Sequence, residues 1–248
     1  MMRKTDWPVL DRSVIGSDVA LDAWLNAART DGAVAFIDKE EKWTSFDCVA
    51  KLRNIVGIRR IGHTGTLDPL ATGLLIICFG RATKDIDDFQ NEDKVYDVVV
   101  KLGARTATDD REGDEEITDV KADDADIIRE LESFVGTQTQ IPPAFSAVRI
   151  RGKRQYEIAR KGRTVIDVPR IVTINSIANI RVSWPFVSFT MTCSRGTYVR
   201  SIARDLGSKL GCGGYVWELR RTQSGAVRVD DAVQLSELMQ VMDMRTVS

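Results

Sequence analysis

The spacing of apolar residues predicts several helices along the chain. Between Ser17 and about Arg29, apolar side chains recur every three or four positions, and Ser17 can cap the helix that they define. A second helix with this spacing follows Thr44 or Ser45 and ends at Gly57. Further helices are predicted over residues 81–89, 126–134 and 198–210, and from Leu235 onward. The apolar side of the helix over 126–134 consists of Ile127, Ile128, Leu131 and Phe134.

Other segments have the alternation or the continuous apolar run that is typical of strands. These strands are predicted over residues 33–38, 74–79, 96–102, 172–178, 187–193 and 215–220, and those over 172–178 and 187–193 form a pair. Helices and strands mix without a regular βαβ alternation. The predicted class is therefore α+β, with a mixed, largely antiparallel sheet and flanking helices.

The segment from Gly62 to Gly73 interrupts this pattern. It contains three glycines, one proline, the only histidine of the chain and one carboxylate, and an apolar run follows it directly. Because glycine and proline exclude a regular helix here, we expect a fixed loop that displays Asp68 at the start of a buried strand. On these residues alone, a catalytic carboxylate and an aspartate that caps a turn are equally good interpretations.

Composition excludes several classes of protein. The chain has 248 residues, which is enough for one large domain or for one domain with a small appendage. It lacks both a signal-peptide pattern at its start and an apolar stretch near the roughly 20 residues that span a bilayer, so we expect a cytoplasmic location and no membrane. Four widely spaced cysteines and one histidine predict buried thiols, with no disulfide framework, no zinc site and no multi-histidine metal site.

Charge is segregated along the chain although the formal net charge is only −1. Residues 109–126 are rich in Asp and Glu, whereas residues 149–163 are rich in Arg and Lys and contain Tyr156. A near-neutral total argues mildly against a nucleic-acid partner, but a basic segment of this kind could bind phosphates. A solvated basic surface is the alternative.

Three motifs in order resemble the bacterial tRNA pseudouridine synthase B family. They are Gly62–Gly73, Lys94-Val95-Tyr96 and Ser194-Arg195-Gly196-Thr197-Tyr198-Val199-Arg200. The resemblance implies isomerisation of uridine to pseudouridine at position 55, in the TΨC loop of tRNA, on a fold with a central RNA-binding cleft. It implies no cofactor, because the isomerisation needs neither a redox change nor a metal.

The resemblance also implies the catalytic residues. Asp68 would initiate cleavage of the uracil glycosidic bond after the base has flipped out of the RNA. Arg200 would be its buried ionic partner. Tyr96 would stack on uracil and help to remove the C5 proton, although a tyrosine in an alternating strand is usually a core residue.

Five residues are expected to bind substrate through the same resemblance. His63 would face the RNA that remains when the uridine is extruded, and Asp110 would contact the substrate loop from a turn. Leu219 would pack on the target uracil, and Tyr198 would pack beneath the site. Lys39 would be a pocket residue. The chain departs here from the family pattern Asp-Lys-Pro-x-Gly-x-Thr-Ser, since Glu40 replaces the proline and Lys42 replaces the glycine. The turn geometry is therefore in question, because glycine adopts a positive φ more readily than lysine does.

The resemblance divides the chain and assigns it a partner. Residues 1–30 form an N-terminal extension and residues 31–248 a catalytic domain, with no C-terminal PUA domain. Residues 143–167 form a basic insertion that clamps RNA. Its backbone contacts come from Arg151, Lys153, Arg154 and Arg160.

We expect a monomer that binds the TΨC stem-loop and needs no obligatory protein partner. Two alternatives are a non-catalytic tRNA-binding or tRNA-folding protein and a guide-RNA-dependent pseudouridine synthase. A phosphate-binding role for the glycine-rich loop ranks last, because no Gly-Lys-Ser/Thr follows Gly65 or Gly73 and Asp68 would repel the phosphate.

Overall fold

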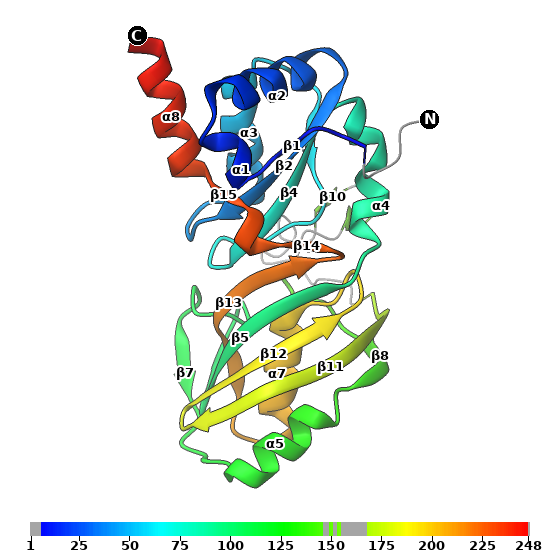
Figure 1. Ribbon diagram of the computed structural model, residues 1–248. Coiled ribbons are helices and arrows are strands. Elements are labelled where there is room, and N and C mark those ends of the chain that lie inside the picture. Colours follow the sequence, from blue (N-terminus) through cyan, green and yellow to red (C-terminus); the bar gives the residue numbers. More distant parts are fainter. Residues whose placement is uncertain (1–5, 146–148, 151–152, 155–167, 248) are drawn as a thin grey trace. The chain divides into compact units, whose positions relative to one another are not determined.

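The computed structural model describes residues 6–145, 149–150, 153–154 and 168–247 (Figure 1). The chain divides into two compact units. Unit 1 consists of Met1–Tyr96 and Arg220–Ser248, and unit 2 of Asp97–Leu219. The strands β5 (Lys94–Leu102) and β13 (Gly214–Ser224) each contribute residues to both units.

Unit 1 is built on strands that follow the order β1-β2-β4-β13, with β3 on β4, β15 on β2 and β14 on β13. Strand β2 runs antiparallel to β4, from Gly32 opposite Gly80 to Lys39 opposite Gly73. The bounds of the remaining strands are β1 (Val9–Leu10), β2 (Gly32–Lys39), β3 (Ile61–His63), β4 (Thr72–Gly80), β14 (Val227–Arg228) and β15 (Val233–Gln234).

Two helices of unit 1 begin where the sequence predicts caps. Ser17 accepts a hydrogen bond from Ala20 N at the start of α2, and Thr44 forms a capping box with Asp47 at the start of α3. Gly57 ends α3 in the left-handed conformation, with φ 78°. The helical segments are α1 (Arg12–Ile15), α2 (Asp18–Thr30), α3 (Ser45–Val56), η1 (Arg81–Asp85), α4 (Ile86–Gln90), η2 (Val229–Asp231) and α8 (Leu235–Val247).

Strand β4 forms the centre of the core of unit 1. Its seven interior residues are buried, and each fully buried Leu, Ile or Phe side chain contributes about 1.5–3 kcal/mol. Trp24 of α2 packs edge-on against Phe79 with ring centroids 5.2 Å apart, and its Nε1 donates to Val34 O at 3.0 Å. Helix α2, from the predicted extension, thus packs on β2 and β4.

Unit 2 contains a sheet in the order β13-β5-β12-β11-β8 and two short hairpins, β6–β7 and β9–β10. Strands β11 and β12 pair antiparallel, as predicted. Helices α5 (Asp124–Glu132) and α7 (Val199–Lys209) lie on one face of this sheet (Figure 1). The further strands are β6 (Ala104–Thr106), β7 (Glu115–Ile117), β8 (Gly136–Gln140), β9 (Arg149–Ile150), β10 (Lys153–Arg154), β11 (Arg170–Ser183) and β12 (Phe186–Cys193).

A glycine permits the close packing of α7. A Cβ atom at Gly207 would lie 2.1 Å from the carbonyl carbon of Gly213, so no other residue fits there. Helix α7 therefore approaches the start of β13 backbone to backbone. This contact fixes the last turn of the helix, about two turns after Arg200.

Several predicted elements differ in detail. The segment 81–89 is a 3-10 turn followed by α4, rather than one helix. Helix α5 starts at Asp124, and Ile128 was wrongly assigned to its buried side, since this side chain is 37% exposed. Strand β8 was not predicted, because its Thr and Gln residues at the sheet edge have no apolar alternation. No described helix is long and apolar enough to cross a membrane.

Candidate active site

Asp68 lies on a loop between β3 and β4, residues 64–71, which we call the Asp68 loop. The carbonyl of Asp68 accepts a hydrogen bond from Ala71 N at 3.0 Å, and Thr64 N donates to Ile76 O of β4 at 3.0 Å. The Asp68 side chain is only partly buried. The predicted geometry is confirmed: a fixed loop presents one carboxylate directly before a buried strand.

Lys39 holds this loop from the neighbouring strand. Its side chain is fully buried, and Nζ donates to the carbonyls of Trp43 at 2.6 Å, Glu40 at 3.0 Å and Pro69 at 3.3 Å. An ammonium group has three donors, so these bonds fit its full capacity. The placement of Lys39 indicates a structural role beside Asp68, and its predicted substrate contact stays a prediction.

The turn between β2 and α3, residues 40–44, makes a second connection to the loop; we call it the β2–α3 turn. Lys42 adopts φ 72°, the left-handed conformation, and its backbone N–H donates to Pro69 O at 2.9 Å. The lysine thus takes the positive φ that a glycine would adopt without strain. Beyond the turn, Ser45 Oγ accepts from Leu67 N at 2.8 Å and donates to Leu67 O at 3.2 Å.

Arg221, which was not among the predicted site residues, fixes the other side of the loop. This buried side chain donates from Nε to Leu74 O at 2.6 Å and from Nη2 to Gly65 O at 3.2 Å. Its backbone lies against Gly73, where φ is 99° and a Cβ would be 2.3 Å from Arg221 O. Only glycine therefore fits at the start of β4.

His63 lies at the end of β3, opposite Ile77 of β4, and not in the loop itself as expected. Burial, followed by the positive charge of Arg221, lowers the pKa of the imidazole below its usual value. Its Nδ1 is buried and finds no hydrogen-bond partner among the described residues. Both effects favour the neutral imidazole over the imidazolium.

Arg220 and Asp38 form a two-point ion pair next to this region. Arg220 Nη2 lies 2.7 Å from Asp38 Oδ2 and Nη1 lies 2.9 Å from Oδ1. Such a bidentate pair is both strong and directional. It connects β13 with the end of β2, one residue before Lys39. Tyr96, the last residue of the first segment of unit 1, is 9% exposed in β5.

Arg200 is a buried residue of unit 2, 5% exposed, at the start of α7. Its Nη1 donates to Thr108 O at 3.0 Å and lies 3.4 Å from Asp110 Oδ2, while Nη2 donates to the carbonyl of Phe145 at 2.9 Å. A buried guanidinium needs such acceptors because it stays charged. Arg200 is buried, as predicted, and one of its partners is Asp110. Its predicted pairing with Asp68 stays a prediction.

Asp110 organises its own turn. Its Oδ1 accepts from Thr108 Oγ1 at 2.6 Å and from Glu112 N at 3.0 Å, and the residue is only 3% exposed. This environment explains why an acidic residue can be buried there. The predicted contact of Asp110 with the RNA loop stays a prediction.

A second arginine repeats the pattern one helical turn later. Arg204 Nη1 lies 3.2 Å from Asp109 Oδ2 and Nη2 donates to Ile141 O at 2.9 Å. Burial raises the pKa of Asp109 despite the opposing charges of Arg204 and Arg200. Arg200 and Arg204 thus join the same two segments, the turn at 108–110 and residues 141–145.

The other predicted residues of unit 2 have simpler surroundings. Tyr198 is held through its backbone, since its N–H donates to Gln140 Oε1 at 2.7 Å and its carbonyl accepts from Gln140 Nε2 at 3.1 Å. Leu219 is 7% exposed in β13. The side chains predicted to contact the RNA backbone lie outside the described part of the chain: Arg151, Lys153, Arg154 and Arg160.

Among the described residues, the thiols and acidic groups form neither a disulfide nor a metal site. All four cysteines are buried and free, as predicted, and burial raises the pKa of the Cys48 thiol to about 11. Within the described ranges no group of three His, Cys, Asp or Glu side chains could hold a metal ion. Among the described residues, the candidate site groups are therefore Asp68 on its loop in unit 1 and the Arg200–Asp110 pair in unit 2.

The fold is that of a pseudouridine synthase. A solved structure described as a Cbf5-Nop10-Gar1 complex matches with a TM-score of 0.65 and 27% identity, over 86% of this chain and 54% of that chain. A second, described as an H/ACA RNP bound to a substrate RNA containing 2′-deoxyuridine, matches with a TM-score of 0.62 and 25% identity. This chain spans about half the length of those solved chains.

Sequence comparisons define the family more closely. The model of the TruB family pseudouridylate synthase N-terminal domain matches residues 53–199, and that of the tRNA pseudouridylate synthase B C-terminal domain matches residues 200–246. The chain belongs to the TruB family of pseudouridylate synthases. A protein of Clostridium novyi (strain NT) named tRNA pseudouridine synthase B is 45% identical over 196 residues, 79% of this chain and 68% of that protein. A protein of the same name from Burkholderia pseudomallei (strain 668) is 44% identical over 213 residues, 86% of this chain and 70% of that protein.

Proposed function

We propose that this chain isomerises uridine to pseudouridine at position 55 in the TΨC loop of tRNA, with Asp68 as the catalytic carboxylate. The observation that carries the proposal is the fixation of the Asp68 loop. Lys39, Lys42, Ser45 and Arg221 bind the backbone on both sides of Asp68. Such fixation places a carboxylate accurately against a reacting atom, and accurate placement lowers the barrier of the reaction.

The reaction needs a nucleophile or base, a means of moving one proton and no further reagent. In the proposed sequence, Asp68 initiates cleavage of the C1′–N1 bond of the flipped uridine. The uracil then turns and forms the C1′–C5 bond, the C5 proton leaves with help from Tyr96, and N1 ends protonated. Atoms and electrons balance because the product is an isomer of the substrate.

Arg200 has an electrostatic role in this proposal. It is a charged group at the start of α7, buried and held by Asp110 and by two carbonyls. We propose that it compensates the charge of Asp68 when RNA excludes water from the site. His63 would face the RNA that remains after base flipping.

The substrate and the cellular setting are part of the proposal. The two relatives are named for tRNA, and a tRNA enzyme acts where tRNA is found, in the cytoplasm. We propose a monomer that needs no protein partner. The Cbf5 structure comes from a complex with other proteins. The alternative that an experiment must distinguish from a stand-alone enzyme is therefore a guide-RNA-dependent synthase.

One experiment tests both the substrate and whether the chain acts without a guide RNA or a protein partner. The purified chain is incubated with a transcribed TΨC stem-loop and with the same stem-loop carrying cytidine at position 55, and pseudouridine is mapped by chemical modification. We expect complete conversion at position 55 of the first RNA and none elsewhere. Tight binding without conversion would support a non-catalytic protein, and conversion only after addition of a guide RNA or partner would contradict the stand-alone enzyme.

A further inference from the structure

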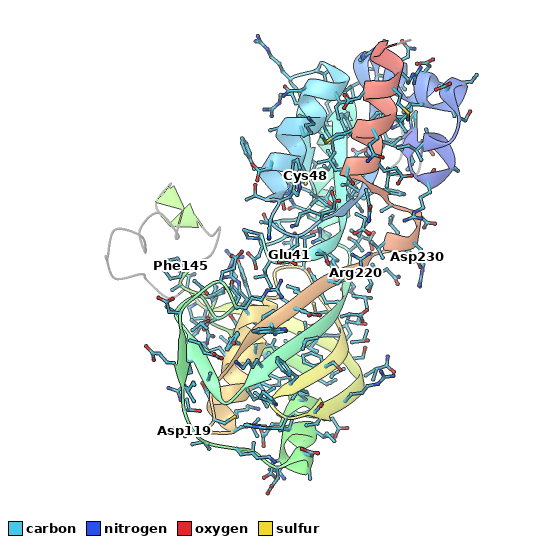
Figure 2. All side chains as sticks on the ribbon, turned by 90° about the vertical axis from the view of Figure 1, so that its left-hand side faces the viewer. Glu41, Cys48, Asp119, Phe145, Arg220 and Asp230 are labelled. Atoms are coloured by element: carbon cyan, nitrogen blue, oxygen red, sulfur yellow. The ribbon has the colours of Figure 1, made fainter. Side chains whose placement is uncertain are left out.

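Helix α8 is connected to the β2–α3 turn by one hydrogen bond between residues far apart in sequence. Ser236, the second residue of α8, donates from Oγ to Glu40 Oε1 at 2.9 Å, in partly buried surroundings. The helix also packs beside α3, which carries Cys48 in Figure 2. Leu235 and Leu238 of α8 are buried at 1% and 0% exposure, so the helix is firmly seated where it carries Ser236.

The β2–α3 turn is also the part of the chain that holds the Asp68 loop. The carbonyl of Glu40 accepts from Lys39 Nζ, and the same Nζ donates to Pro69 O. Lys42 N donates to Pro69 O as well. Contacts therefore run from Ser236 through Glu40 and Lys39 to Pro69, the residue that follows Asp68.

This turn lacks the usual sources of rigidity. Lys42 occupies the left-handed region at φ 72°, which costs a residue with a Cβ about 1 kcal/mol. Glu40 has no ring to fix its φ, unlike a proline. The conformation must be stabilised by contacts, and the Glu40 side chain has one to α8.

We propose that Glu40 and Ser236 are positioning residues for Asp68, so that α8 serves as a brace of the catalytic loop. The inference rests on the proposed function, because it assumes that Asp68 is the catalytic carboxylate. Neither residue touches the substrate in this scheme. Each acts through the backbone of the β2–α3 turn.

The test compares Glu40→Ala, Ser236→Ala and Glu40→Gln with the unaltered chain in single-turnover pseudouridine formation on tRNA. Losing one positioning hydrogen bond should lower the rate constant about fivefold in both alanine variants and leave the Kd for tRNA unchanged. Glu40→Gln keeps an amide oxygen that accepts from Ser236 Oγ, so it should retain the full rate. The double alanine variant should be no slower than either single one, since both remove the same contact.

Arg245→Ala is the matched control. Arg245 attaches the same helix to α2, through Asp22 at 2.5 Å and Asp18 at 3.7 Å. Its loss should lower the free energy of unfolding and leave the rate constant unchanged. Unaltered rates in Glu40→Ala and Ser236→Ala, an equal loss in Glu40→Gln, or an equal loss in Arg245→Ala would each overturn the proposal. Absence of pseudouridine with the unaltered chain would instead refute the proposed function.

Discussion

The backbone N–H of Lys42 donates a 2.9 Å hydrogen bond to the carbonyl of Pro69, although Lys42 must adopt φ 72° to do so. A strained residue thus holds the residue that follows the candidate catalytic carboxylate. Strain of this kind persists only where the surroundings determine the conformation. Lys39, Ser45 and the brace from α8 provide those surroundings.

Lys42→Gly should therefore stabilise the protein. Glycine adopts the left-handed conformation without steric cost, which outweighs its greater entropy in the unfolded chain, and we expect a gain of about 0.5 kcal/mol in the free energy of unfolding. Urea denaturation measures this change. Lys42→Val is the opposite control, because the β-branched valine is disfavoured at positive φ. It should lower the free energy of unfolding by at least about 1 kcal/mol. A glycine variant less stable than the unaltered chain would contradict the assigned conformation.

Asp110→Asn tests the buried pair with Arg200. The amide can still accept from Thr108 and Glu112, but it leaves the guanidinium without a charged partner at this position, where both side chains are about 5% exposed or less. Breaking a buried pair is costly, and because Arg200 keeps two carbonyl acceptors we expect a loss of about 2 kcal/mol. Urea denaturation of Asp110→Asn and of the exposed control Asp114→Asn would measure it. Equal stabilities of the two variants would show that the pair contributes little.

His63 gives stability a defined dependence on pH. Its folded-state pKa is lowered, so between that pKa and the usual value near 6.5 the unfolded chain binds more protons than the folded one. Stability should fall as the pH is lowered through this window and should be constant above it. Because the chain has one histidine, His63→Gln should remove the slope. Thermal unfolding between pH 5.5 and 7.5 measures the pH dependence of stability. If His63→Gln keeps the same slope, another group causes it.

The thiols should be unreactive in the folded protein. All four are buried, and burial raises the pKa of Cys48 to about 11, so little thiolate exists at pH 8. We expect no labelling by a thiol reagent within minutes under native conditions and four labels in denaturant. Rapid labelling of a folded sample would show that the packing around at least one of the four cysteines opens readily.

Local signals explain what the sequence predicted correctly. The caps at Ser17 and Thr44, the stop at Gly57 and the buried run of β4 depend on neighbouring residues, and all four are present in the structure. The loop that displays Asp68 was predictable for the same reason, since glycine and proline act on their own backbone. Roles tied to the family, such as those of Tyr96 and Leu219, stay predictions.

Contacts between distant segments could not be predicted. Arg221 reaches Gly65 across 156 positions, and Ser236 reaches Glu40 across 196. Lys39 was expected in a pocket, yet its burial among carbonyls follows from the packing of β2, the turn and the loop together. Strand β8 was missed because its pairing with β11, and not its polar sequence, determines its conformation.

The most direct test of the central claim compares Asp68→Asn with the unaltered chain in single-turnover pseudouridine formation on tRNA, together with the Kd for the same tRNA. Asparagine has nearly the same shape as aspartate but is a far weaker nucleophile and base, and the loop is held through its backbone. The account predicts that the variant binds tRNA with an unchanged Kd and forms pseudouridine at least about 10⁴-fold more slowly. Pseudouridine formation by Asp68→Asn at a rate within tenfold of the unaltered chain would contradict it.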